Sequence, residues 1–131
     1  MLKIIPDTNT LLGMNQFNLN LFSELERVCN FKYKIYTLSN IIEELEKLIN
    51  KGKLPEKKAA SFALRLIKTK GIKVIKTDLK HVDDSLCKLN PKEFIVITQD
   101  KKLKLRLKEK GIKIIIIRQK NHLEWETKNV L

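Results

Sequence analysis

Five short runs of β-branched and aliphatic residues recur along the chain, and segments with helical periodicity separate them. The strand-like runs cover residues 2–5, 33–38, 72–75, 94–98 and 112–117. Consecutive apolar positions are typical of strands covered on both faces, and strands that alternate with helices form parallel sheets with right-handed crossovers. The pattern therefore predicts an α/β fold, a three-layer α/β/α sandwich around a central five-stranded parallel sheet.

Apolar residues three and four positions apart predict the helices between these strands. We expect helices over residues 20–29, 40–50, 55–70 and 80–89, with Ser39 as an N-cap and residues 13–20 as a loop. Residues 101–110 have two interpretations, because their leucines alternate as in a strand while most residues are strong helix formers. We expect a helix there, N-capped by Asp100.

The length of 131 residues suits one domain, and we expect it to span residues 1–118, with residues 119–131 as a tail that packs on it or extends from it. Trp125 in this tail either docks on the body or stacks on a nucleic-acid base. Two cysteines without CxxC spacing predict reduced thiols and a cytoplasmic protein. The longest aliphatic run, residues 114–117, is too short to cross a membrane.

The formal net charge is +12, and lysine contributes most of the positive charge. A strong positive balance favours polyanionic partners, above all nucleic acid. A lysine-rich surface adapted to heat is the alternative explanation for part of this excess.

Carboxylates stand where two of the expected strands end. Asp7 follows the first strand and Asp100 follows the fourth, while Asp83 and Asp84 open a helix. Ligands of parallel α/β sheets bind at the carboxyl ends of the strands, so these acids are candidate metal ligands. Taken singly, each acid is better explained as a helix cap or turn residue. Converging carboxylates repel one another unless a cation neutralises them, and oxygen-only ligands suit Mg2+ or Mn2+.

Four segments resemble, in order, the four motifs of PIN-domain ribonucleases. They are Ile-Pro-Asp-Thr-Asn-Thr-Leu-Leu ending at Leu12, Ser-Asn-Ile-Ile-Glu-Glu-Leu-Glu-Lys-Leu ending at Leu48, Val-Asp-Asp-Ser-Leu ending at Leu86, and Ile-Thr-Gln-Asp-Lys-Lys-Leu ending at Leu103. The resemblance implies the strand order 3-2-1-4-5, which places the first and fourth strands side by side and brings Asp7 to Asp100.

The resemblance also implies roles for individual residues. The catalytic acids that hold one or two Mg2+ or Mn2+ ions would be Asp7, Glu44, Asp84 and Asp100. Two adjacent aspartates cannot both face inward from one helix, and Asp84 is chosen over Asp83 because a small residue, Ser85, follows it as in the family. Supporting positions would be Asn9 and Thr98, which orient the acids, together with Asp83.

The activity implied is that of a metal-dependent endoribonuclease, either a toxin held by an antitoxin or a nuclease that processes structured RNA. The implied partners are RNA, a cognate antitoxin or a ribosome-assembly partner, and a second copy in a homodimer. Candidate RNA contacts are Lys101, Lys102, Lys104 and Arg106, for which a solvated helix face is the alternative. A role in the site for His81 is less expected than a place on the surface.

Two other functions remain as alternatives. A catalytically silent RNA-binding or assembly module could use the same fold, although the presence of all four acids disfavours it. A haloacid-dehalogenase-type phosphatase needs a second aspartate two positions after the first, where this chain has Asn9. An asparagine cannot donate and accept a proton as that acid must.

Overall fold

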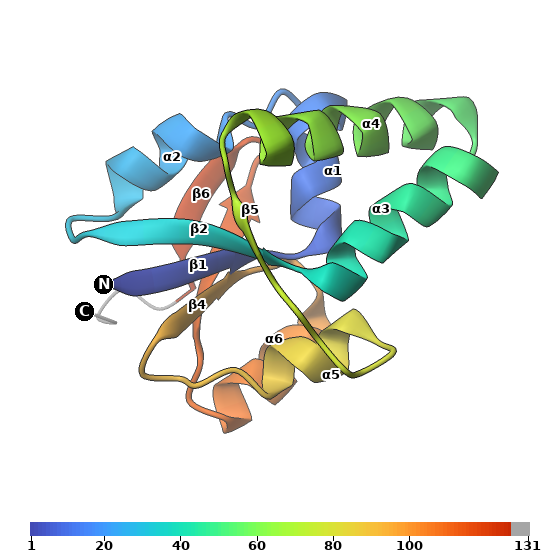
Figure 1. Ribbon diagram of the computed structural model, residues 1–131. Helices are drawn as coiled ribbons and strands as arrows, with labels where there is room; N and C mark the ends of the chain where they lie inside the picture. Colours follow the sequence, from blue (N-terminus) through green and yellow to red (C-terminus); the bar gives the residue numbers. More distant parts are fainter. Residues whose placement is uncertain (127–131) are drawn as a thin grey trace.

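The computed structural model describes residues 1–126, which form a six-stranded sheet with helices on both faces (Figure 1). The strands are β1 (Leu2–Pro6), β2 (Tyr33–Leu38), β3 (Lys73–Ile75), β4 (Phe94–Ile97), β5 (Lys113–Arg118) and β6 (His122–Trp125). The helices are α1 (Thr8–Gln16), α2 (Leu21–Val28), α3 (Ser39–Lys51), α4 (Leu54–Thr69), α5 (Val82–Cys87) and α6 (Lys101–Glu109).

The strand order is β3-β2-β1-β4-β5-β6. The first five strands are parallel in the predicted order, so that part of the prediction is confirmed. Beyond these five strands, β6 adds an antiparallel strand beside β5, which the sequence did not predict. The right-handed crossovers of a parallel sheet require helices between strands, whereas β6 needs only a short turn after β5.

The core lies on both faces of the sheet. Figure 1 shows α1, α2 and α4 above the sheet and α5 and α6 below it, and α1 packs against α4. Ile4, Ile5, Val96 and Ile97 are buried at consecutive positions of the two central strands, as expected for strands covered on both sides. No helix within residues 1–126 is long and apolar enough to cross a membrane.

Two local predictions, for residues 13–16 and for Ser39, were wrong. Residues 13–16 belong to α1 and not to a loop, because Leu11, Leu12 and Met14 are buried against the body while Gly13 weakens the helical signal. Ser39 is the first residue of α3 and not its N-cap, and its hydroxyl lies 2.9 Å from the hydroxyl of Thr77. Asp100 does cap α6 as predicted, through a hydrogen bond from the Leu103 amide at 2.9 Å.

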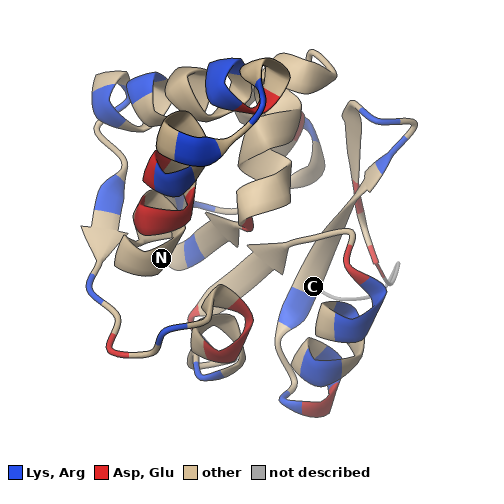
Figure 2. Ribbon diagram, turned by 90° about the vertical axis from the view of Figure 1, so that its right-hand side faces the viewer, with Lys and Arg blue, Asp and Glu red and all other residues tan. Residues whose placement is uncertain are grey.

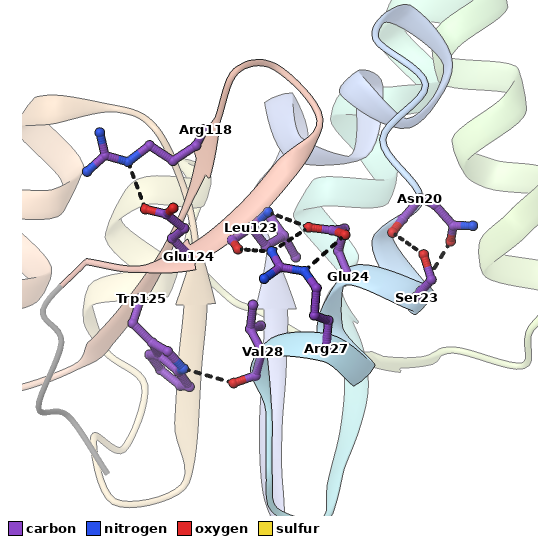
Figure 3. Close-up of polar contacts among 9 residues, drawn as sticks. All are labelled: Asn20, Ser23, Glu24, Arg27, Val28, Arg118, Leu123, Glu124 and Trp125. Atoms are coloured by element: carbon purple, nitrogen blue, oxygen red, sulfur yellow. Dashed lines mark hydrogen bonds and ion pairs between the residues drawn. The ribbon is translucent and has the colours of Figure 1, made fainter.

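The C-terminal segment turns back at Gln119 and Lys120, both with positive φ, and adds β6 to the sheet. Figure 3 shows β6 held against α2: Arg27 donates to the Leu123 carbonyl at 2.7 Å, and the Trp125 indole donates to the Val28 carbonyl at 3.0 Å. Trp125 therefore docks on the body, which confirms the packing alternative over base stacking. The part of the expected tail from residue 127 to 131 lies outside the described residues.

Both cysteines are buried and free, as expected for reduced thiols. Burial raises the pKa of the Cys29 thiol to about 11. A thiol with such a pKa stays protonated and unreactive at neutral pH, so Cys29 acts as an apolar core residue.

Replacing Trp125 tests how far the C-terminal hairpin stabilises the domain. We expect Trp125→Ala to lower the free energy of unfolding by about 2 kcal/mol, because a half-buried aromatic ring and its indole hydrogen bond are lost. Trp125→Phe keeps most of the packing and should lose only about 1 kcal/mol for the hydrogen bond. Urea denaturation followed by circular dichroism measures both. Equal stability of Trp125→Ala and wild type would show that β6 is not held by this contact.

Candidate active site

A pocket of about 670 Å³ opens at the carboxyl ends of β1 and β4, between α1, α3, α5 and α6. Its walls include all four predicted acids. The acidic residues that line it are Asp7, Glu44, Glu56, Asp83, Asp84 and Asp100. Two positively charged side chains, Lys47 and Arg106, also line it. The pocket is therefore strongly acidic within a protein whose formal net charge is +12.

Asp7 lies at the base of this pocket. The parallel pairing of Pro6 with Ile97 places it at the end of β1, where its amide donates to the Ile97 carbonyl at 3.0 Å. Its carboxylate caps α1 by accepting a hydrogen bond from the Thr10 amide at 2.8 Å. Only 7% of Asp7 is exposed.

Burial is the main cause of a raised pKa for Asp7, since it removes water from the carboxylate. Hydrogen bonding by Thr98 and Thr10 lowers this pKa and offsets part of the effect, and the negative charge of Asp83 raises it further. Without a cation nearby, the ionised form of Asp7 is thus disfavoured in the folded protein.

Thr98 connects the two strand-end aspartates. It is fully buried, its hydroxyl accepts a hydrogen bond from the Asp100 amide at 3.1 Å, and it also lies close enough to Asp7 to lower the pKa of that carboxyl. Asp100 is exposed at the pocket wall while one of its oxygens caps α6. The predicted orienting position of Thr98 therefore lies between both acids.

Glu44 reaches the pocket from α3, where the hydroxyl of Thr8 donates a hydrogen bond to it. Asn9 is exposed and lines the pocket, but its side chain makes no hydrogen bond to an acid within residues 1–126. Thr8, which the sequence did not single out, therefore lies beside an acid, while the orienting role of Asn9 stays a prediction. The position of Thr8 directly after Asp7 was the feature of the sequence that could have indicated this contact.

The adjacent aspartates of α5 have different surroundings. Asp84 accepts a hydrogen bond from the Arg106 guanidinium at 2.8 Å, and this contact lowers the pKa of Asp84. Asp83 is exposed, but partial desolvation and then the negative charge of Asp100 raise its pKa; the positive charge of Arg106 offsets part of this, and Glu44 and Asp84 contribute less. Asp83 is thus the α5 acid that raises the pKa of Asp7, while Asp84 is held by Arg106.

Hydrogen bonds from the start of α3 hold the segment that carries α5. The buried Asn40 amide group donates to the Ser85 hydroxyl at 2.8 Å and to the Leu79 carbonyl at 3.2 Å. Ser39 accepts from the Thr77 amide at 2.9 Å. These residues, which we name the α3–α5 clasp, were missed by the sequence analysis. Two polar residues directly after a buried strand were the only signal for them.

The four predicted RNA contacts on α6 divide between three surroundings. Lys104 pairs with Glu126 at 3.4 Å, and Arg106 pairs with Asp84 at the pocket. Lys101 and Lys102 are exposed and form no ion pair among residues 1–126. The four side chains point to different sides of α6, and of the four only Arg106 lines the pocket. His81 also lines the pocket and is exposed.

The carboxylates of the pocket suit a divalent cation that keeps several of its waters better than a cation enclosed entirely by protein ligands. No three acidic, histidine or cysteine side chains within residues 1–126 are arranged to hold a metal ion directly. Mg2+ keeps several of its waters and is commonly bound through only one or two carboxylates. Asp7 and Asp83 have raised pKa values because burial and neighbouring carboxylates disfavour their ionised forms, and a divalent ion would relieve both effects.

Comparison with known proteins gives three consistent findings. The family model described as a PIN like domain matches residues 4–120. Ribonuclease VapC4 of Methanocaldococcus jannaschii is 36% identical over 126 residues, which cover 95% of this chain and 96% of that protein. The structure of the PIN domain endonuclease Utp24 has a TM-score of 0.77 and 26% identity, and the match covers 95% of this chain and 90% of that chain.

The charge of Asp7 leads to a prediction about stability. Because the folded-state pKa of Asp7 is raised, the folded protein binds this proton more tightly than the unfolded chain does. Ionised Asp7 therefore lowers the free energy of unfolding at every pH above its folded-state pKa, and this effect vanishes below the unfolded pKa of about 3.9.

We expect metal-free Asp7→Asn to be more stable than wild type near neutral pH, by on the order of 1 kcal/mol, since asparagine is neutral and still caps a helix. The difference should shrink as the pH falls towards about 4. Thermal unfolding in a chelator across this pH range measures it, with the exposed Asp78→Asn as the matched control. A lower stability of Asp7→Asn at every pH would contradict the prediction.

Proposed function

Because the chain belongs to the PIN-domain family, we propose that it is an endoribonuclease that hydrolyses RNA phosphodiester bonds with Mg2+ or Mn2+ bound in the acidic pocket. The observation that carries this proposal is the convergence on one pocket of acids that follow β1 and β4 or lie on α3 and α5. The names of the two relatives, a ribonuclease and an endonuclease, support RNA cleavage over the hydrolysis of a small phosphoester.

We assign cation binding to Asp7, Asp83, Asp100 and Glu44, of which one or two carboxylates contact the ion directly and the others bind its waters. A divalent ion bound there supplies Lewis acidity, which activates a water and stabilises charge on the phosphate. Asp83 replaces Asp84 in this set because Arg106 contacts Asp84 directly at 2.8 Å, whereas it affects Asp83 only through its charge, and Asp100 and Glu44 raise the pKa of Asp83. Asp84 then acts as a positioning residue for Arg106.

The remaining pocket residues orient these groups and bind the substrate. Thr98 and Thr10 hold the Asp7 carboxylate, and Thr8 holds Glu44. Arg106 lies at the pocket with 47% of its side chain exposed, where a guanidinium can bind a phosphate oxygen of RNA. The lysine-rich outer surface attracts the RNA backbone over a longer range.

The family resemblance also suggests an antitoxin or ribosome-assembly partner and a homodimer, which we retain as proposals. The phosphatase alternative has no support in the pocket. Asn9, which stands where that chemistry needs an acid, is exposed and cannot exchange a proton. The catalytically silent module remains the alternative that an activity measurement must distinguish.

Cleavage of labelled RNA tests the choice between the adjacent aspartates. We expect Asp83→Asn to lower the Mn2+-dependent cleavage rate about 100-fold or more, because a carboxylate close to the cation is lost. Asp84→Asn should lower it by less than about tenfold, since only the position of Arg106 changes. The two variants remove the same charge from neighbouring positions of α5, so each is the matched control for the other. The reverse order of effects would overturn the assignment to Asp83.

Three further measurements test the nuclease assignment as a whole. Chelation by EDTA, Asp7→Asn and Asp100→Asn should each abolish cleavage, and cleavage that survives in both variants would come from a contaminating enzyme. Salt-sensitive RNA binding without product at any metal concentration would instead identify a silent module. Turnover of para-nitrophenyl phosphate in the absence of RNA cleavage would favour the phosphatase.

The α3–α5 clasp gives a separate prediction. Asn40→Ala leaves the Leu79 carbonyl and the Ser85 hydroxyl without their partner, and we expect it to lower the free energy of unfolding by about 2 kcal/mol. If the clasp positions Asp83, the metal concentration for half-maximal cleavage should also rise, by about tenfold. The Ser39 hydrogen bond holds Thr77, which lies farther from Asp83 along the chain, so Ser39→Ala should change that concentration less than Asn40→Ala does. An unchanged metal dependence in Asn40→Ala would limit the clasp to a structural role.

A further inference from the structure

The edge of the sheet at β3 is only partly covered. β2 runs from Tyr33 to Leu38, but β3 pairs only with its second half, from Tyr36 onwards. Residues 33–35 pair with residues 2–4 of β1 on their inner side. On their outer side no strand of the described chain lies beside them. The first half of β2 therefore presents an uncovered backbone edge.

A groove of about 380 Å³ lies along this edge, between α2, the first half of β2 and the turn that leads into β3. Its apolar lining comes mainly from Phe22, Tyr33, Tyr36 and Ile72. These side chains are only half-buried, and the Lys70 ammonium lies 4.9 Å from the centroid of the Phe22 ring. The groove thus combines partly exposed rings with an uncovered strand edge.

The charge of the groove is positive. Lys34, Lys70 and Lys73 line it and are exposed, and Glu26 is its one acidic lining residue. The groove lies where β2 and β3 begin, whereas the acidic pocket lies at the carboxyl ends of β1 and β4. The two sites therefore differ in charge and lie at opposite ends of the strands.

We propose that this groove binds an extended acidic peptide segment of a partner protein, which adds a strand beside residues 33–35. Strand addition satisfies the uncovered backbone groups, while alternate side chains of the peptide fill the apolar lining. Carboxylates in the peptide complement the three lysines. Single-stranded RNA could use the lysines and the rings, but it would leave the strand edge unpaired, so the peptide fits more of the observed features.

The inference does not depend on the nuclease assignment, because none of these residues lines the acidic pocket. Exposed lysines on an edge strand also have a simpler explanation, since they prevent edge-to-edge aggregation. The peptide proposal predicts specific binding at this edge, which that explanation does not.

Fluorescence anisotropy with defined probes tests the proposal. The probe is a fluorescein-labelled peptide of alternating glutamate and valine, compared with a lysine–valine peptide and with the glutamate–valine peptide N-methylated at every second residue. We expect the acidic peptide to bind, the basic peptide not to bind, and N-methylation to weaken binding at least about tenfold, because it removes main-chain donors. Amide chemical shifts of residues 33–35 should change on binding.

Protein variants locate the site. We expect the double variant Lys34→Glu/Lys73→Glu to weaken binding of the acidic peptide about tenfold or more. Lys92→Glu/Lys110→Glu makes the same change in net charge at exposed positions away from the groove and should bind as wild type does. RNA cleavage should be equal in the two double variants, which separates this test from the test of the nuclease.

Three results would overturn the proposal. Equal binding of the N-methylated peptide would show that the strand edge is not used. Absence of binding by the acidic peptide would leave the lysines with the aggregation-preventing role alone. Binding of labelled oligouridylate that is lost in Lys34→Glu/Lys73→Glu, without peptide binding, would make the groove a nucleic-acid site.

Discussion

The parallel pairing of β1 with β4 is the contact on which the rest of the site depends. It aligns Pro6 with Ile97, so that both strands end at the same level of the sheet. Asp7 follows one strand end directly, and Thr98 and Asp100 follow the other. A shift of one residue in this register would move the buried side chains of β4 to the opposite face and separate the two aspartates. The same pairing therefore sets both the core and the pocket.

The electrostatics of the pocket differ from those of the rest of this basic chain. Burial and like charge raise the pKa values of Asp7 and Asp83, which means that the folded protein holds carboxylates where their ionised forms are disfavoured. This arrangement lowers stability in the absence of a cation and strengthens the attraction for one. Arg106 neutralises only Asp84 by direct contact, so the acids nearer the strand ends remain without an arginine partner in the described chain.

The two edges of the sheet are covered to different extents. At the β5 edge, β6 covers the strand and α2 holds the hairpin through Arg27 and Trp125 (Figure 3). At the other edge, β3 is only three residues long and leaves the first half of β2 uncovered. Figure 2 shows basic positions interrupted by an acidic one, Asp78, along the crossover from β3 to α5, and acidic positions on α5 itself.

The sequence by itself determined the parallel α/β core and the location of the strand-end acids. Consecutive β-branched residues favour a strand buried on both faces, and Asp7 and Asp100 lie just after such strands. Its resemblance to PIN-domain ribonucleases also implied the strand order that the fold confirms. These features are local, or belong to motifs that the family shares, and so they can be read without coordinates.

Only the tertiary structure decided the features that depend on long-range contacts. The polar segment of β6 has no strong strand signal and becomes a strand because β5 and α2 supply its partners. The different surroundings of Asp83 and Asp84 follow from the packing of α5 against α6, which brings Arg106 to Asp84 across 22 positions. Thr8 reaches Glu44, and Asn40 reaches Ser85, for the same reason. Side-chain partners distant in sequence are chosen by packing, and neither propensity nor periodicity contains that information.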